Sequence, residues 1–153
     1  MTAENLKRTP LLEVHQSLNA RMVPFEGWEM PVQYSGIVEE HRAVRSAAGL
    51  FDVSHMGEFE ISGPGAKDFL QFLTTNDLEK LRVGRCQYSF LLNSEGGTVD
   101  DTMIYRRADN TYLLVVNASN IEKDWAHVSN VATNFAQFEL VNRSEDYALL
   151  ALQ

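Results

Sequence analysis

The chain has 153 residues, of which 44% are hydrophobic and 22% charged, and a formal net charge of -8. This length supports one domain with a real core rather than two comfortable ones. The acidic balance argues against nucleic-acid binding, which requires a basic surface, and is compatible with a small-molecule ligand or a protein partner. The single cysteine, Cys86, excludes an internal disulfide and a cysteine-rich metal site.

The sequence also lacks the usual signals for membranes and export. No apolar run is long enough to span a bilayer, and the first ten residues resemble neither a signal peptide nor a transit peptide. We therefore expect a cytoplasmic protein that does not associate with membranes.

The N-terminal third is expected to contain two helices. Thr9 and Pro10 form a typical helix start, with a hydroxyl cap followed by proline at the first helical position. A turn-rich stretch at Phe25–Pro31 follows. The pattern predicts a second helix over Ile37–Ala47 that ends near Gly49.

The rest of the chain alternates strand and helix patterns. We expect a strand over Phe51–Ile61, a short amphipathic helix over Ala66–Leu73, and a helix that begins at a Ser119/Glu122 capping box and ends near Val131. The remaining predicted strands are Cys86–Leu92, Thr98–Arg106, Tyr112–Val116, Phe138–Val141 and Tyr147–Leu152. Hairpin-joined strands with intervening helices predict an α+β fold, an antiparallel sheet with flanking helices.

The final predicted strand is apolar and stops where the sequence stops. A buried strand normally continues into a turn and further pairing, because its backbone groups need partners. We therefore expect the chain to be part of something longer, and expect its exposed strand edges to favour self-association.

Two adjacent aspartates, Asp100 and Asp101, follow the Gly96-Gly97 turn at the start of a predicted strand. Side chains alternate between faces, so one aspartate can face solvent and the other the interior. An inward Asp101 would share its side of the strand with aromatic and apolar residues, namely Val99, Met103 and Tyr105, beside Tyr88, Phe90 and Leu92 of the preceding strand. Such a site would suit a flat heteroaromatic ligand with hydrogen-bond donors. The alternative is a surface pair after a hairpin turn.

A second group with catalytic residue types is Asp52, Ser54 and His55. These are the components of a hydrolase triad, but triads are defined by spatial geometry. On an extended strand His55 would point away from the other two, which argues against a triad. The four histidines show no metal-binding spacing.

Seven motifs occur in order along the chain: Lys7–Leu11, Phe25–Pro31, Glu40–Arg45, Gly49–Met56, Thr75–Asp77, Gly96–Asp101, and Val116–Ala118 with Glu122–Asp124. Taken together, they resemble the T-protein of the glycine cleavage system, a tetrahydrofolate-dependent aminomethyltransferase. Each motif alone is weak, whereas seven in the right order are very specific.

The resemblance implies a reaction and its partners. Members of this family take an aminomethyl group from the lipoyl arm of the H-protein, release ammonia and pass the one-carbon unit to tetrahydrofolate. The resemblance also implies which residues of this chain form the site. Asp101 would be the catalytic aspartate that orients the folate, Tyr88 and Asn117 would contact the folate, and Met56 and Tyr105 would line its pocket. No metal is implied, and Asp100 would be structural.

The chain departs from the family in length, because T-proteins are longer and have three domains around a central folate site. We expect about residues 1–50 and 138–153 to form part of the first domain and about residues 51–137 to form the second. An incomplete, T-protein-like folate site of this kind is expected to have little or no transferase activity by itself.

Two alternatives remain open. One is the folate domain of a sarcosine or dimethylglycine oxidase, although those domains usually follow a flavin domain. The other is a non-catalytic folate-binding relative, which would be expected to lose the aspartate and the aromatic residues that this chain keeps.

Overall fold

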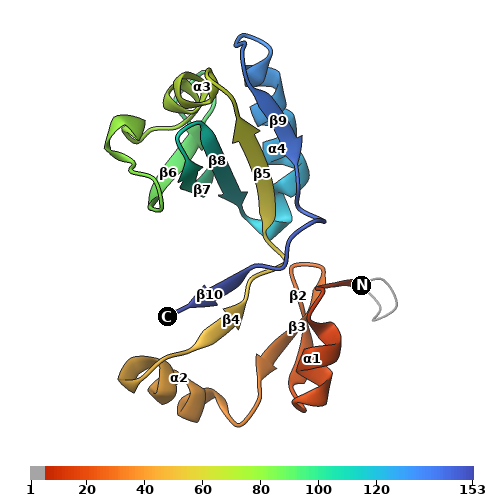
Figure 1. The fold of residues 1–153 in the computed structure, drawn as a ribbon. Coiled ribbons are helices and arrows are strands. Elements are labelled where there is room, and N and C mark those ends of the chain that lie inside the picture. Colours follow the sequence, from red (N-terminus) through yellow and green to blue (C-terminus); the bar gives the residue numbers. More distant parts are fainter. Residues whose placement is uncertain (1–5) are drawn as a thin grey trace. The chain divides into compact units, whose positions relative to one another are not determined.

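The computed structural model describes residues 6–153, which form two compact units. The first unit contains the described residues up to His55 together with Tyr147–Gln153, and the second contains Met56–Asp146. Helices combine with mainly antiparallel strands in this structure, which confirms the predicted α+β class. Figure 1 labels most of the elements of both units.

The first unit has a three-stranded sheet, a separate two-stranded ribbon and two helices. Its elements are β1 (Lys7–Arg8), α1 (Leu12–Ser17), β2 (Arg21–Phe25), β3 (Trp28–Gln33), α2 (Ile37–Ser46), β4 (Leu50–Asp52) and β10 (Leu150–Leu152). Strands β2 and β3 form a hairpin where the sequence predicted only turns. Glu26 and Gly27, both with positive φ, form its two-residue turn, which allows this close connection.

Two local predictions in this unit were wrong. Thr9 does not cap α1, because its hydroxyl donates to Asp52 across the unit at 2.7 Å. The strand predicted over Phe51–Ile61 is interrupted after β4. There the Asp52 carboxylate accepts from the backbone N–H of Ser54, which turns the chain and ends the strand. The predicted helix at Ile37 is confirmed as α2.

The second unit is a five-stranded sheet in the order β6-β7-β8-β5-β9 with two α-helices. Its elements are β5 (Gly57–Ser62), α3 (Ala66–Leu73), η2 (Leu78–Lys80), β6 (Cys86–Leu92), β7 (Thr98–Ala108), β8 (Thr111–Val116), η3 (Ala118–Asn120), α4 (Ile121–Ala132) and β9 (Glu139–Asn142). The helix predicted to begin at a capping box is present as α4, but no side chain caps its first turn.

Strand β9 pairs antiparallel with β5 inside this sheet. The sequence had grouped residues from Phe138 onward with the first unit, whereas the structure divides the chain after Asp146. The difference arises because β9 pairs with β5, and local sequence pattern does not show which strand β9 will pair with.

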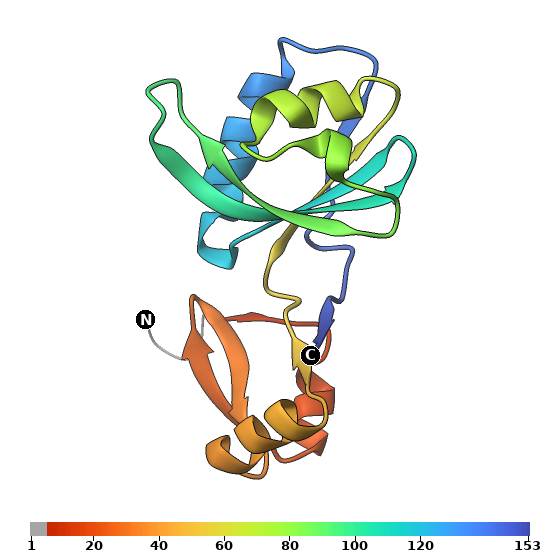
Figure 2. The same ribbon diagram turned by 90° about the vertical axis from the view of Figure 1, so that its left-hand side faces the viewer.

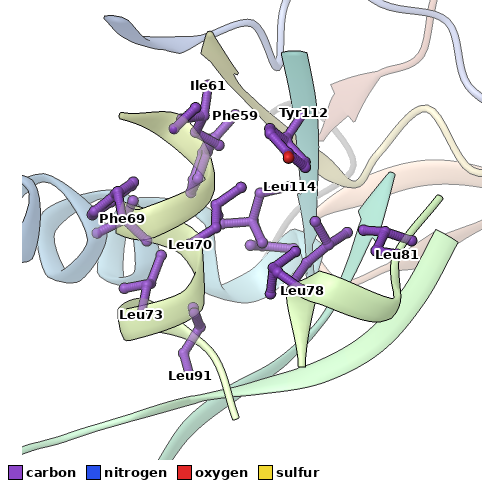
Figure 3. Close-up of a cluster of buried hydrophobic side chains, with 14 residues drawn as sticks. Phe59, Ile61, Phe69, Leu70, Leu73, Leu78, Leu81, Leu91, Tyr112 and Leu114 are labelled. Atoms are coloured by element: carbon purple, nitrogen blue, oxygen red, sulfur yellow. The ribbon is translucent and has the colours of Figure 1, made fainter. Parts of the chain in front are cut away.

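Both helices cover the same face of this sheet (Figure 2). Phe69 and Leu70 of α3 and Val128 of α4 are fully buried against strand residues such as Leu114. Phe69 also stacks on Phe138 with ring centroids 4.6 Å apart. Figure 3 shows apolar side chains of α3, η2 and the strands, such as Phe69, Leu78 and Leu114, meeting in one cluster. We call this the covered face, and the opposite side of the sheet the open face.

Candidate functional site

The two adjacent aspartates of β7 point to opposite faces of the sheet. Asp100 lies on the covered face and is 8% exposed, whereas Asp101 is half-buried on the open face. The inward carboxylate is therefore Asp100, which decides between the two orientations that the sequence left open for the pair. A register shift between Leu91 and Leu92 makes Val99 an extra residue on β7, so Val99 packs against the core and not beside Asp101.

Asp101 is held by two side chains from neighbouring strands. The Tyr88 hydroxyl on β6 donates to Asp101 Oδ2 at 3.0 Å, and Asn117 Nδ2 donates to Asp101 Oδ1 at 2.9 Å. The hydrogen bond to Asp101 raises the pKa of Tyr88, because ionising the phenol would lose the bond and add a second negative charge. Each carboxylate oxygen of Asp101 therefore has a donor while the face beside it stays open.

Cross-strand register explains why these residues meet. Phe90 pairs with Asp101, and Thr102 pairs with Val116, so continuing the ladder by one residue sets Asn117 opposite Asp101. Gly57 also pairs with Val116, and the same continuation sets Met56 opposite Asn117. The predicted site residues Tyr88, Asp101, Asn117 and Met56 thus gather at one end of the open face.

Tyr105 lies on the same face but not in this group. It is four residues along β7 from Asp101, a separation of about 13 Å at strand spacing. Its neighbours in register are Cys86 and Leu113. Tyr105 therefore extends the open face and does not contact Asp101.

Between Asp101 and Tyr105, a row of paired residues on the open face crosses four neighbouring strands. It consists of Tyr88, Met103, Val115 and Glu58, paired in that order. Tyr88 is 49% exposed and meets the edge of Phe90 at 5.2 Å between ring centroids. The other end of the row is buried, and burial raises the pKa of Glu58 to about 8. Only the half of the row on β6 and β7, Tyr88 and Met103, therefore presents an aromatic and apolar surface on which a flat ligand could lie.

The loop after α3 fixes the strand that carries Tyr88. Thr75 Oγ1 accepts from the backbone N–H of Phe90, and Asn76 Nδ2 donates to the Tyr88 carbonyl at 2.9 Å. The backbone N–H of Asn76 donates to the Ser89 hydroxyl. These contacts give the Thr75–Asp77 motif a physical role that its sequence did not reveal.

The triad-like residues of the first unit do not form a triad. The histidine bonded to Asp52 is His15 and not His55: its Nε2 is 2.7 Å from Asp52 Oδ2, and Tyr34 Oη is 2.8 Å from His15 Nδ1. The Ser54 hydroxyl donates to the Leu149 carbonyl at 3.4 Å. His55 meets the edge of the Phe25 ring. Asp52 is thus an organising residue of the first unit, not a partner of a nucleophile.

Neither of two sizeable hollows contains Asp101. One of about 540 Å³ in the first unit is lined by residues such as Tyr34 and Val44, and one of about 570 Å³ in the second by residues such as Phe72 and His127. Among residues 6–153, no three metal-binding side chains come together. No described helix has the length and apolar character needed to cross a membrane.

The arrangement on the open face suits one chemical task. A carboxylate positioned by a phenol and an amide, beside aromatic and apolar side chains, can accept hydrogen bonds from ring N–H groups of a flat ligand. This set of residues contains no nucleophile activated by a neighbouring base, so it is suited to orienting a reactant rather than to covalent catalysis.

The chain is an α+β protein with a hydrogen-bonded carboxylate on the open face of its larger sheet, and comparison with known proteins identifies its family. Residues 11–153 match the family described as the GCVT N-terminal domain, and the chain belongs to that family. The resemblance to T-proteins that the seven motifs indicated is confirmed.

Individual relatives agree with this assignment. The chain is 60% identical over 148 residues to an aminomethyltransferase of Deinococcus deserti and 58% identical over 152 residues to one of Symbiobacterium thermophilum. A crystal structure of glycine cleavage system aminomethyltransferase T from Bartonella henselae superposes with a TM-score of 0.87 at 38% identity. These alignments cover 97–98% of this chain but only 40–41% of each relative. The chain thus spans about two fifths of their length.

Sequence reasoning missed one buried part of the site. Asp124 on α4 is fully inaccessible and lies within hydrogen-bonding reach of Asp100, the strand neighbour of Asp101. A usable signal existed, because Asp124 precedes the core residue Val128 by four positions and so occupies the buried side of the helix.

Proposed function

We propose that this chain carries the folate-binding face of an aminomethyltransferase of the glycine cleavage system. In that reaction the methylene carbon of an aminomethyl-lipoyl group forms bonds to N5 and N10 of tetrahydrofolate. Its bonds to nitrogen and sulfur break, and the two protons displaced from N5 and N10 leave with ammonia and the lipoyl thiol.

The observation that carries the proposal is the hydrogen-bonded carboxylate on the open face. Asp101 accepts from Tyr88 and Asn117 and retains lone pairs for a ligand donor, since each carboxylate oxygen can accept two hydrogen bonds. A negative charge at this point would also favour the positive charge that develops as ammonia leaves. Its contribution is orientation and charge complementarity.

The other residues have supporting roles in the proposal. Tyr88 and Asn117 hold Asp101 and contact the folate, Met56 lines the site beside Asn117, and Tyr105 lines the more distant part of the face. The partner that delivers the aminomethyl group would be a lipoylated H-protein.

The test is tetrahydrofolate binding measured by calorimetry, comparing the chain with Asp101→Asn. A charge-assisted hydrogen bond contributes about 1.5–3 kcal/mol, so we expect affinity to fall at least about tenfold. Asp109→Asn is the matched control, since this exposed carboxylate lies at the opposite end of β7. Binding that is unaffected by Asp101→Asn would contradict the role of Asp101.

A further inference from the structure

A buried pair of acids lies on the covered face directly behind Asp101. Asp124 projects from α4 and is fully inaccessible, and Asp100 on β7 is 8% exposed. The two carboxyl groups lie within hydrogen-bonding reach of each other. No described group donates to Asp100 Oδ2 or to either oxygen of Asp124. Two ionised carboxylates in such contact would repel each other and neither could donate, so the arrangement favours one neutral member that donates to the other.

The surroundings determine which member keeps the proton. Burial, and then the charge of Asp100, raise the pKa of Asp124 to about 8. Burial also acts to raise the pKa of Asp100, but hydrogen bonds from Asp124, Asn117 and Asn120 together hold it below its usual value. Asp124 is therefore the neutral acid and Asp100 the carboxylate.

The other charged groups around Asp124 do not change this assignment. Lys123 Nζ is 3.9 Å from Asp124 Oδ1 and favours its ionised form, but it is half-exposed and donates to the Val99 carbonyl at 2.7 Å. Asp101 adds a further negative charge that opposes ionisation. Burial and the negative charges of Asp100 and Asp101 raise the pKa of Asp124 by more than the positive charge of Lys123 lowers it.

The pair is connected to the open face through one amide. Asn117 Nδ2 donates to Asp100 Oδ1 at 3.0 Å and to Asp101 Oδ1 at 2.9 Å. Because both acceptors are carboxylate oxygens, only the NH₂ side of the Asn117 amide can point toward them. The position of Asp100 therefore sets the orientation of the group that holds Asp101.

We propose that Asp124 is a positioning residue for the folate site, acting as a neutral acid that donates to Asp100 and thereby fixes Asn117 and Asp101. This inference rests on the proposed function, in which Asp101 binds the folate. Ionisation of Asp124 would put two carboxylates in contact, move Asp100 away from its neighbour and release the Asn117 amide. Folate affinity is then expected to fall as Asp124 loses its proton.

The network can be tested without any ligand by NMR. We expect the Asp124 side-chain carbon signal of the chain to titrate near pH 8, and the Asn117 amide signals to shift with the same midpoint. Asp124→Asn keeps a donor but cannot ionise, so the Asn117 shift should disappear. Glu122→Gln, an exposed carboxylate on the same helix, is the control and should keep it. An Asp124 that is ionised at pH 6, or Asn117 signals that ignore its titration, would overturn the proposal.

Folate binding supplies the second readout. At pH 7 we expect Asp124→Ala to weaken tetrahydrofolate binding about tenfold and Asp124→Asn to recover most of that loss. Between pH 7 and 9 the affinity of the unaltered chain should fall and that of Asp124→Asn should not. Equal losses in both variants would refute the positioning role. If the unaltered chain binds no folate, the proposed function fails, while the NMR titration still decides the network.

Discussion

The two faces of the five-stranded sheet use the same residue type for different purposes. On the covered face, Asp100 is buried beside Asp124 of α4, whose pKa burial raises to about 8. On the open face, the adjacent Asp101 is bonded to Tyr88 and Asn117, and its side of the sheet is not covered by a helix. One step along a strand therefore separates a buried carboxylate from the one that we propose binds the folate, because strand side chains alternate.

The largest contrast between the faces concerns aromatic residues and stability. Phe69→Ala on α3 should cost about 3–5 kcal/mol in unfolding free energy, because it leaves a cavity next to Phe135 and Phe138. Phe90→Ala on the open face should cost about 1 kcal/mol or less, because that ring is 38% exposed. Denaturant unfolding measures both, and similar losses would contradict the division into a covered and an open face.

The aspartates themselves give the next contrast. Asp100→Ala should cost about 1–3 kcal/mol, because it leaves the buried Asp124 without its acceptor. Asp101→Ala should cost less than about 1 kcal/mol, since Asn117 keeps its bond to Asp100. The comparison would fail if Asp101→Ala proved the more destabilising of the two in thermal and denaturant unfolding.

A pH effect should follow from the two buried acids of the second unit. The pKa values of Glu58 and Asp124 rise on folding from 4.5 and 3.8 to about 8. The folded chain keeps these protons at pH values where the unfolded chain loses them, so their contribution is complete below about pH 4. It then falls steadily as the pH rises toward about 8.

Glu58→Gln isolates one of these groups, because glutamine keeps the shape but cannot ionise. The unfolding free energy of this variant should fall less steeply between pH 5 and 8 than that of the unaltered chain, as followed by denaturant unfolding at several pH values. Glu139→Gln, an exposed position on β9, serves as control. An unchanged slope in Glu58→Gln would show that Glu58 is ionised in the folded chain.

The smallest expected effect is on the Tyr88 phenol. Its hydrogen bond to Asp101 raises its pKa, so Asp101→Asn should lower that pKa toward its usual range. Ultraviolet titration of the phenol measures the shift, with Tyr88→Phe identifying its signal. A Tyr88 pKa that does not respond would mean that the 3.0 Å contact is not maintained in solution.

Local patterns were enough to locate most elements of the second unit. The bounds of α3 and β6 agree with their predicted ranges, because amphipathic spacing and turn residues such as Gly96 and Gly97 are properties of short segments. Predictions from local pattern were wrong where a residue is held by a contact distant in sequence. Thr9 bonds to Asp52 instead of capping α1. Strand β9 pairs with β5 of the second unit, although the sequence had grouped it with the first.

The sequence by itself determined the fold class, the family and the Asp-Asp pair as a feature of interest, since these depend on composition, periodicity and ordered motifs. Only the tertiary structure decided which aspartate faces the core, because alternation separates the two side chains but the packing of α3 and α4 determines which face is covered. The register shift beside Val99 decided in addition that Val99 packs against the core. Helical spacing to Val128 places Asp124 on the buried side of α4, but its partner Asp100 lies 24 residues earlier and is brought near it only by the packing of α4 on the covered face.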